Sequence, residues 1–308
     1  NLLENILTQA LDSYEVIPSI SEEEQQAKAN AELLQAYLSA KKIEGCSEKT
    51  IGYYQSTIDT LFVAVCKPVC DVTTNDIRNY LSGYQEQRKV SRVTIDNMRR
   101  IFSSFFAWLE DEDFIVKSPV RRIHRVRTES LVKEVLTDEN MEVLRDSCQE
   151  IRDIAMIDLL ASTGMRVGEL VNLNREDIDF HERQCVVFGK GNKEREVYFN
   201  ARTKIHLQNY LSSRTDDNPA LFVSLSNPHS RLSISGVEVR LRTLGRKVNI
   251  AKVHPHKFRR TLATMAIDKG MPIEQVQRLL GHVKIDTTLH YAMVNQNNVK
   301  MAHRKYIG

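Results

Sequence analysis

The sequence predicts a mainly α-helical protein of two domains, an all-helical N-terminal domain and an α+β domain with a small antiparallel sheet. Three observations lead to this fold class. The 308 residues are enough for one large domain or two of ordinary size. Apolar residues recur every three or four positions over most of the chain, which is the helical period. Two short β-rich runs, at residues 185–188 and 195–199, flank a glycine-containing turn and indicate a hairpin.

Composition places the chain among folded globular proteins, with 42% hydrophobic and 27% charged residues. No apolar run reaches the ~18 residues needed to cross a bilayer, and no secretory leader opens the chain. We therefore expect a cytoplasmic protein with no membrane partner. Its five cysteines are an odd number without a secretory context, so we expect reduced thiols rather than disulfides.

The net charge of +3 hides an uneven distribution. Residues 1–30 carry six acids and one base, which gives −5 and leaves +8 for the rest of the chain. Residues 117–133 contain six bases, one acid and a Ser-Pro pair, so we expect a basic interdomain linker there. A solvated charge run and a contact with a polyanion both fit this stretch, because clustered bases gain affinity by releasing counterions from phosphates.

The first two predicted helices lie in the acidic part of the chain and just beyond it. The first covers residues 2–11 and ends before Pro18. The second begins after a capping box formed by Ser21 and Glu24. Its expected apolar stripe consists of Ala27, Ala31, Leu34 and Leu38.

Three further helices complete the N-terminal half. The third runs from Ser47 to about Val65, and the fourth begins near Thr73 or Thr74. The fifth begins at Ser91 and carries a long apolar stripe: Ile95, Met98, Phe102, Phe105, Phe106 and Leu109. Three arginines lie off that stripe, available to an outside partner: Arg92, Arg99 and Arg100.

The C-terminal half mixes helices with the hairpin. Residues 151–161 are apolar nearly all round, which predicts a buried helix that Gly164 closes. Near the end of the chain, Pro272 at the first position and Gly281 after the last position bracket a short helix. A further helix follows, for which Asp286 or Thr287 would be the cap.

Several common catalytic motifs are absent from the sequence. It contains no P-loop, no dinucleotide-binding glycine motif, no H-E-x-x-H and no paired C-x-x-C. The acids at positions 110–113 are consecutive and do not share a helical face, so a solvated helix end explains them better than a metal site. Cys66 and Cys70 lack a second ligand pair. We therefore expect neither a metal nor another cofactor.

A set of cations, two histidines and one tyrosine remains. Arg166 follows a glycine turn near the start of a helix, with Glu169 three residues later to orient it. Lys190 lies between two glycines at the hairpin turn. The other members are His256 and Arg259 at i and i+3 on a helix, His282 directly after the bracketed helix, and Tyr291 on the next one.

Together these residues meet the needs of attack on a phosphodiester. Arg166, Arg259 and a histidine can hold the charge that develops on the phosphate oxygens. Lys190 on the hairpin can donate the proton that a leaving 5′-oxygen needs. A tyrosine phenol has a pKa of about 10, so a cationic surrounding is needed to make it a nucleophile.

The ordered motifs resemble those of the tyrosine recombinase (phage integrase) family, in particular its Xer-type and mobile-element integrase members. The resemblance covers roughly residues 26–295 and rests on T-G-M-R-V-G-E-L, G-K-G-N-K-E-R, P-H-K-F-R, L-L-G-H and H-Y. Members often carry a histidine directly after the second arginine, where this chain has Arg260. This departure puts only a local packing or DNA contact in question.

The resemblance implies a role for each member of the set. Arg166 and Arg259 would clamp the phosphate, Lys190 would be the general acid, and Tyr291 would be the nucleophile. His256 would contact the phosphate and act as acid or base, His282 would be the second histidine beside the phosphate, and Glu169 would support them. DNA contacts are expected from Arg92, Arg99, Arg100, Arg121, Arg122, Arg125 and Arg127.

The resemblance also implies a two-domain DNA clamp. Residues 1–25 would be an acidic helical arm, 26–116 a core-binding domain, 117–133 the basic linker and 134–308 the catalytic domain. The expected partner is double-stranded DNA with specific recombination sites, bound by a homo-tetramer on two sites. Whether the free protein is a monomer and whether accessory proteins take part stay open. Residues 295–308 would contact a neighbouring protomer or pack on their own domain.

The expected function is site-specific DNA recombination through a 3′-phosphotyrosyl intermediate and a Holliday junction, without metal or ATP. The chain would be encoded by a bacterium, a phage or a mobile element. Two alternatives stay open: a type IB topoisomerase-like relaxing enzyme and a non-catalytic DNA-binding relative. The acidic arm would contact another protomer or restrain the basic surface.

Overall fold

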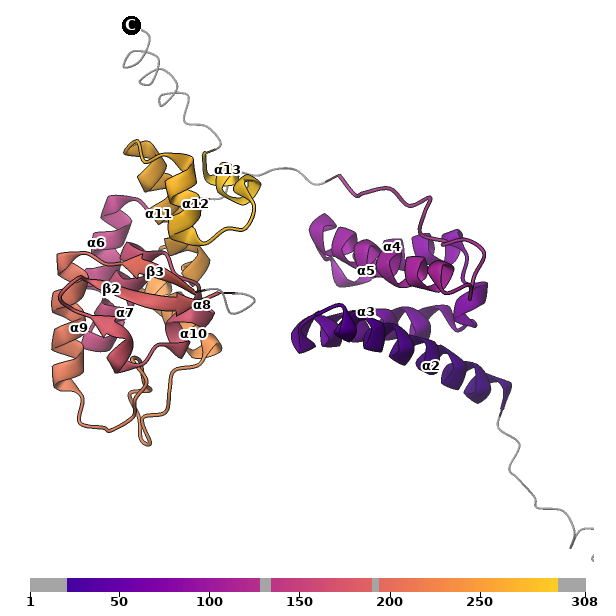
Figure 1. The fold of residues 1–308 in the computed structure, drawn as a ribbon, viewed down its shortest axis with the longest axis horizontal. Coiled ribbons are helices and arrows are strands. Elements are labelled where there is room, and N and C mark those ends of the chain that lie inside the picture. The colour runs from indigo at the N-terminus through magenta and orange to yellow at the C-terminus, as the bar shows by residue number, and fades with distance from the viewer. Residues whose placement is uncertain (1–20, 128–133, 190–193, 293–308) are drawn as a thin grey trace, which may run out of the picture. The chain divides into compact units, whose positions relative to one another are not determined.

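The computed structural model describes residues 21–127, 134–189 and 194–292, and the chain divides into two compact units between Ser130 and Leu131 (Figure 1). The described elements are helices and one three-stranded antiparallel sheet, which confirms the predicted fold class. The predicted helix at 2–11, the turn residue Lys190 and the segment 295–308 lie outside the described residues.

The first unit is built from helices whose starts are fixed by side-chain caps. Ser21 and Glu24 form the expected capping box, Ser47 and Ser91 accept hydrogen bonds from the backbone three residues later, and Thr73 forms a second capping box. The predicted starts of these helices are therefore confirmed. The elements are α2 (Glu22–Ile43), α3 (Glu48–Val65), the short 3-10 helix Val69–Asp71, α4 (Thr74–Arg88) and α5 (Arg92–Asp111).

An aromatic cluster fills the core of this unit. Phe105 of α5 is fully buried and meets the rings of Tyr37, Phe62 and Phe106. All six apolar residues predicted on α5 are buried. The stripe predicted for α2 is only half right, because Ala27 and Ala31 are exposed. The buried face is instead Asn30, Leu34, Tyr37 and Leu38, with Asn30 donating to Lys67 O and accepting from Val69 N.

The basic segment begins as part of the first unit. Val120 is buried in its core, and Ser118 N donates to the Glu110 carboxylate at 2.9 Å. Val126 N donates to Asp96 Oδ1 at 3.1 Å. Residues 118–126 are thus held against α5. The acids at 110–113 lie at the end of that helix, as expected. The carboxylate of Glu110 accepts hydrogen bonds from Ser118 N and from Arg121 Nη1.

The second unit combines helices with the sheet. Strands β1 (Ile178–Asp179), β2 (Gln184–Phe188) and β3 (Glu194–Tyr198) pair antiparallel in chain order, with Val186 opposite Glu196. This confirms the hairpin, and the two-residue strand β1 adds to it. The helices are α6 (Asp138–Asp146), α7 (Ile151–Thr163), α8 (Val167–Asn172), α9 (Ala201–Ser213), α10 (Ile234–Lys247), α11 (Pro255–Asp268), α12 (Ile273–Leu280) and α13 (Ile285–Ala292), with the 3-10 helix Arg175–Asp177.

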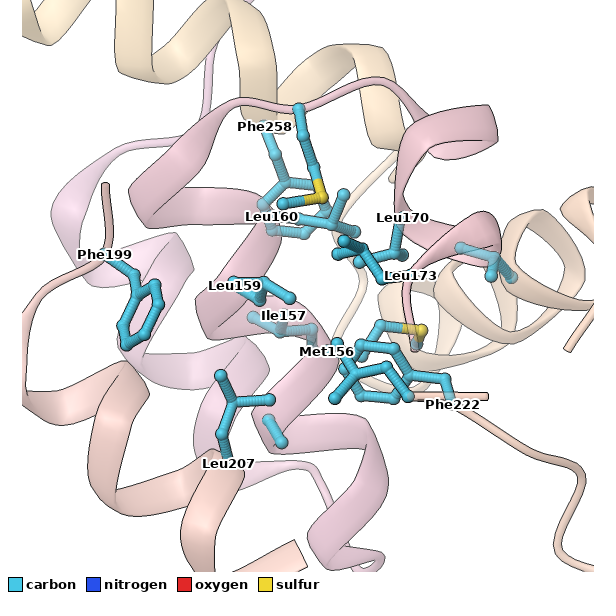
Figure 2. Packing of buried hydrophobic residues seen from close by; sticks show 14 of the residues in the cluster. Met156, Ile157, Leu159, Leu160, Leu170, Leu173, Phe199, Leu207, Phe222 and Phe258 are labelled. Atoms are coloured by element: carbon cyan, nitrogen blue, oxygen red, sulfur yellow. The ribbon is translucent and has the colours of Figure 1, made fainter. Parts of the chain in front are cut away.

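Helix α7 is the centre of the second core, where Met156, Ile157, Leu159 and Leu160 point in different directions into the apolar cluster (Figure 2). It packs against α9, α11 and β3, as a helix that is apolar nearly all round must. Gly164 ends it in the left-handed conformation at φ 59°, as predicted. A Cβ there would also lie 2.7 Å from Leu262 Cδ2, so the turn requires glycine.

Two aspartates of α7 are almost fully buried and carry ion pairs. Asp153 binds Arg152 and Arg240, and Asp158 binds Arg145 at 2.6 Å and His206.

Among the described residues, no helix is long and apolar enough to cross a membrane, and no group of acids, histidines and cysteines is arranged to hold a metal. The five cysteines are free thiols.

Candidate active site

Arg166 is held where α7 turns into α8. After the Gly164 turn it forms the N-cap of α8, and its backbone N donates to Glu169 Oε2 at 2.7 Å. Its Nη1 donates to Glu169 Oε1 at 2.8 Å, and its Nη2 donates to Gly281 O at 3.1 Å. The expected Arg166–Glu169 contact is therefore present, and the guanidinium keeps a partly exposed face.

Glu169 is shared with a second arginine that the sequence analysis did not assign to the site. Arg195, in β3, donates from Nη1 and Nη2 to the two oxygens of Glu169 at 2.6 and 2.7 Å, and its Nε donates to Leu279 O at 3.3 Å. Burial raises the pKa of Glu169, but Arg195 and Arg166 outweigh it and the net shift is downward. Glu169 is thus an ionised carboxylate clamped between two guanidinium groups.

Gly281 allows this arrangement at the end of α12. It adopts φ 64°, and a Cβ there would lie 2.7 Å from Arg195 Cδ. Its carbonyl accepts from Arg166, and the side chain of Arg195 occupies the space that a Cβ would need. Pro272 is the residue before the first turn of α12 rather than its first position, because the helix begins at Ile273.

Arg259 is buried in α11 and is anchored by main-chain carbonyl groups. Its Nη1 donates to Gly164 O at 2.7 Å and its Nη2 donates to Leu280 O. Arg259 therefore contacts the ends of both α7 and α12, and Arg166 contacts the turn that ends α12. The two arginines are far apart in the sequence. The next residue, Arg260, donates to Glu134 O at 2.7 Å.

Both predicted histidines lie within the field of these arginines. Partial desolvation and the charges of Arg259 and Arg166 lower the pKa of His256. Desolvation and the charges of Arg259, Arg166 and Arg195 lower the pKa of His282 to about 4. Near neutral pH the site therefore holds fixed cations beside neutral imidazoles.

Tyr291 lies in α13, the helix that packs against α11 and α12. This helix begins at Ile285, so Asp286 and Thr287 belong to its first turn and the expected cap was wrong. Lys190 lies outside the described residues, between β2 and β3. The structure therefore brings together Arg166, Glu169, Arg259, His256 and His282, with Tyr291 on the adjoining helix.

The arginines expected to contact DNA differ in their surroundings. Arg92, Arg100, Arg122, Arg125 and Arg127 are exposed on the first unit, and Arg121 is 66% exposed with a 3.4 Å contact to Glu110. Arg99 is different, because its Nε donates to Asp96 at 2.9 Å and only 15% of its side chain is exposed. The expectation that Arg99 faces outward is therefore not met.

Comparison with known proteins identifies relatives of both units. Residues 134–298 match the phage integrase family, and residues 33–115 match the N-terminal SAM-like domain of phage integrases. Tyrosine recombinase XerC of Staphylococcus aureus is 30% identical over 284 residues, which cover 87% of this chain and 94% of the relative.

Solved structures show the same fold. The crystal structure of XerA recombinase is 28% identical, with a TM-score of 0.52, and the match covers 91% of this chain and 99% of that one. The Tn1549 transposon integrase in complex with a circular intermediate DNA is 20% identical, with a TM-score of 0.73, over 89% of this chain and 98% of that one.

Removing the charge of Glu169 should destabilise the chain. In Glu169→Gln, Arg195 stays buried without its counter-charge, so we expect the free energy of unfolding to fall by about 3 kcal/mol. Arg202→Gln, which removes an exposed partner of Glu142, should change it by less than about 0.5 kcal/mol. Urea unfolding measures both, and equal losses in the two variants would contradict the assignment.

The lowered pKa of His282 makes a prediction for stability in acid. Between pH 6.5, its ordinary pKa, and about 4, the unfolded chain binds more protons on this ring than the folded chain. The free energy of unfolding should therefore decrease as the pH falls through this window. His282→Gln lacks the titrating ring and should show a shallower decrease, and parallel curves for the two proteins would exclude the shift.

Proposed function

We propose that this chain, which belongs to the phage integrase family of tyrosine recombinases, cuts and rejoins DNA strands through a 3′-phosphotyrosyl intermediate and a Holliday junction. Family membership makes it a tyrosine-type site-specific recombinase that acts on DNA. The observation that carries the mechanism is the convergence of Arg166 and Arg259, from separate segments, on the turns that end α7 and α12.

The two arginines would bind the non-bridging oxygens of the scissile phosphate. Charge on these oxygens increases as the phosphorus becomes five-coordinate, and prepositioned cations stabilise that state more than the ground state. Glu169 and the main-chain carbonyls fix the guanidinium groups before DNA arrives, so little reorganisation is needed during the reaction.

Proton transfer would be divided between neutral and charged groups. The phenolic oxygen of Tyr291 attacks phosphorus, and its proton passes to His256, which is neutral near pH 7 because its pKa is lowered. The bond from phosphorus to the 5′-oxygen breaks, and Lys190 protonates that oxygen. Attack by the 5′-hydroxyl of the partner strand reverses these steps, so the phosphotyrosyl bond conserves the phosphodiester linkage without ATP.

The exposed arginines of the first unit would hold the DNA backbone. Arg92 and Arg100 lie on α5, and the exposed arginines of residues 121–127 follow this helix in the chain. Counterion release on binding phosphates supports their assignment. The domain division proposed is 26–116 for the core-binding domain, 117–133 for the linker and 134–308 for the catalytic domain, with a tetramer assembling on two sites and 295–308 contacting a neighbouring protomer. We place this reaction in the cytoplasm.

Covalent capture of DNA tests the assignment. A library of nicked duplexes, from which the cleaved end diffuses away, should yield a protein–DNA adduct and identify the preferred site. Tyr291→Phe should form no adduct on that site while still shifting it in a gel. An adduct with Tyr291→Phe, or none with the parent on a site that it binds, would refute the mechanism. Relaxation of a supercoiled plasmid without strand exchange would favour the topoisomerase alternative.

The role of Lys190 can be tested with a modified leaving group. Lys190→Ala should cut ordinary DNA at least ~10²-fold more slowly, because the 5′-oxygen leaves without a proton. A site with sulfur in place of that bridging oxygen needs no protonation, so the same variant should cut it at nearly the parental rate. The measurement is single-turnover adduct formation. Equal slowing on both substrates would assign Lys190 to binding instead.

A further inference from the structure

A hydrogen bond joins the loop after α12 to the helix that carries Tyr291. His282 Nδ1 lies 2.8 Å from Thr288 Oγ1, and Thr288 is completely buried in α13. The loop itself is fixed, because His282 N donates to Gln277 O at 3.1 Å and Gln277 Nε2 donates to His282 O at 3.0 Å. The backbone of His282 is thus held by α12, and its imidazole ring is held by α13.

The direction of this hydrogen bond decides which ring nitrogen carries the proton. A neutral imidazole has one N–H donor and one bare nitrogen acceptor, and the partner of one nitrogen sets the state of the other. Near pH 7 the ring is neutral, since desolvation and the charges of three nearby arginines lower its pKa. A tautomer is therefore selected at this position.

The surroundings of Thr288 favour donation by the hydroxyl. Within the described part of the chain, its side chain makes one hydrogen bond, the one to His282 Nδ1. If Nδ1–H were the donor, the hydroxyl proton of a fully buried threonine would be left without an acceptor, which buried polar groups rarely tolerate. Donation from Oγ1 to Nδ1 satisfies both groups.

We propose that Thr288 is a positioning residue, whose hydroxyl donates to Nδ1 of His282 and so keeps the ring proton on Nε2. This inference rests on the proposed function, in which His282 is the second histidine beside the scissile phosphate. An Nε2–H group is a donor to a non-bridging phosphate oxygen, and the opposite tautomer would present a lone pair to that negative charge.

The same contact links two parts of the reaction. Thr288 precedes Tyr291 by three residues, less than one turn of α13. In the proposed reaction, the helix that carries the nucleophile and the histidine beside the phosphate are therefore joined through a single hydroxyl group. Displacement of α13 would release the ring of His282 at the same time as it moves the backbone of Tyr291.

Nitrogen-15 NMR of the histidine rings tests the tautomer without DNA or activity. In the full chain at pH 7, the signals absent from His282→Gln identify this residue. We expect a bare Nδ1 and a protonated Nε2 in the parent and in Thr288→Ser, and a mixture of tautomers in Thr288→Val, which has no hydroxyl. A protonated Nδ1 in the parent, or an unchanged tautomer in Thr288→Val, would overturn the proposal.

Adduct formation on the captured DNA site tests the consequence. Thr288→Val should slow it about 10- to 100-fold, the scale for removing the partner that orients a functional histidine. Thr288→Ser should stay within about 3-fold of the parent, and Thr288→Val should add no further loss to His282→Gln. A loss that persists in the His282→Gln background would show that Thr288 acts elsewhere. If the parent forms no adduct, the proposed function fails, and the NMR result still decides the tautomer.

Discussion

The geometry of the site depends on the ion pairs that the buried carboxylate of Glu169 makes with two arginines. Glu169 lies with 3% of its side chain exposed and accepts hydrogen bonds from Arg166 and Arg195, while the same two arginines reach the carbonyls of Gly281 and Leu279. One buried charge thus connects the start of α8, strand β3 and the end of α12. Burying it is acceptable only because both of its oxygens are paired.

The ends of two helices supply the other constraint. The last carbonyl groups of a helix have no partner within it and carry a partial negative charge. At α7 and α12, the carbonyls of Gly164 and Leu280 accept from Arg259, and that of Gly281 accepts from Arg166. The left-handed glycines turn the chain sharply at these points. Helix termini and guanidinium groups therefore satisfy one another.

Local signals explain what could be predicted from the sequence. Caps at Ser21, Ser47 and Ser91, the apolar stripe of α5 and the Gly164 turn depend on neighbours a few residues away, and each is found in the structure. Arg195 was missed because its partner, Glu169, is distant in sequence and only the folded hairpin brings them together. Its visible signals were a charged residue inside a short strand and its place as the last residue of the G-K-G-N-K-E-R motif. Ala27 and Ala31 were misplaced because helical period alone does not select which face a core covers.

The charges of the site explain how it can hold both arginine cations and neutral imidazoles. Arginine stays protonated in proteins, so Arg166 and Arg259 keep their charge whatever surrounds them. Their fields, together with desolvation, push the pKa values of His256 and His282 downward. The arginines that would stabilise a phosphorane thus also help to keep the imidazoles neutral, with one N–H and one bare nitrogen each. In the proposed reaction the arginines would stabilise charge and the neutral imidazole of His256 would accept a proton, and the packing of α11 against α12 keeps these groups in one site.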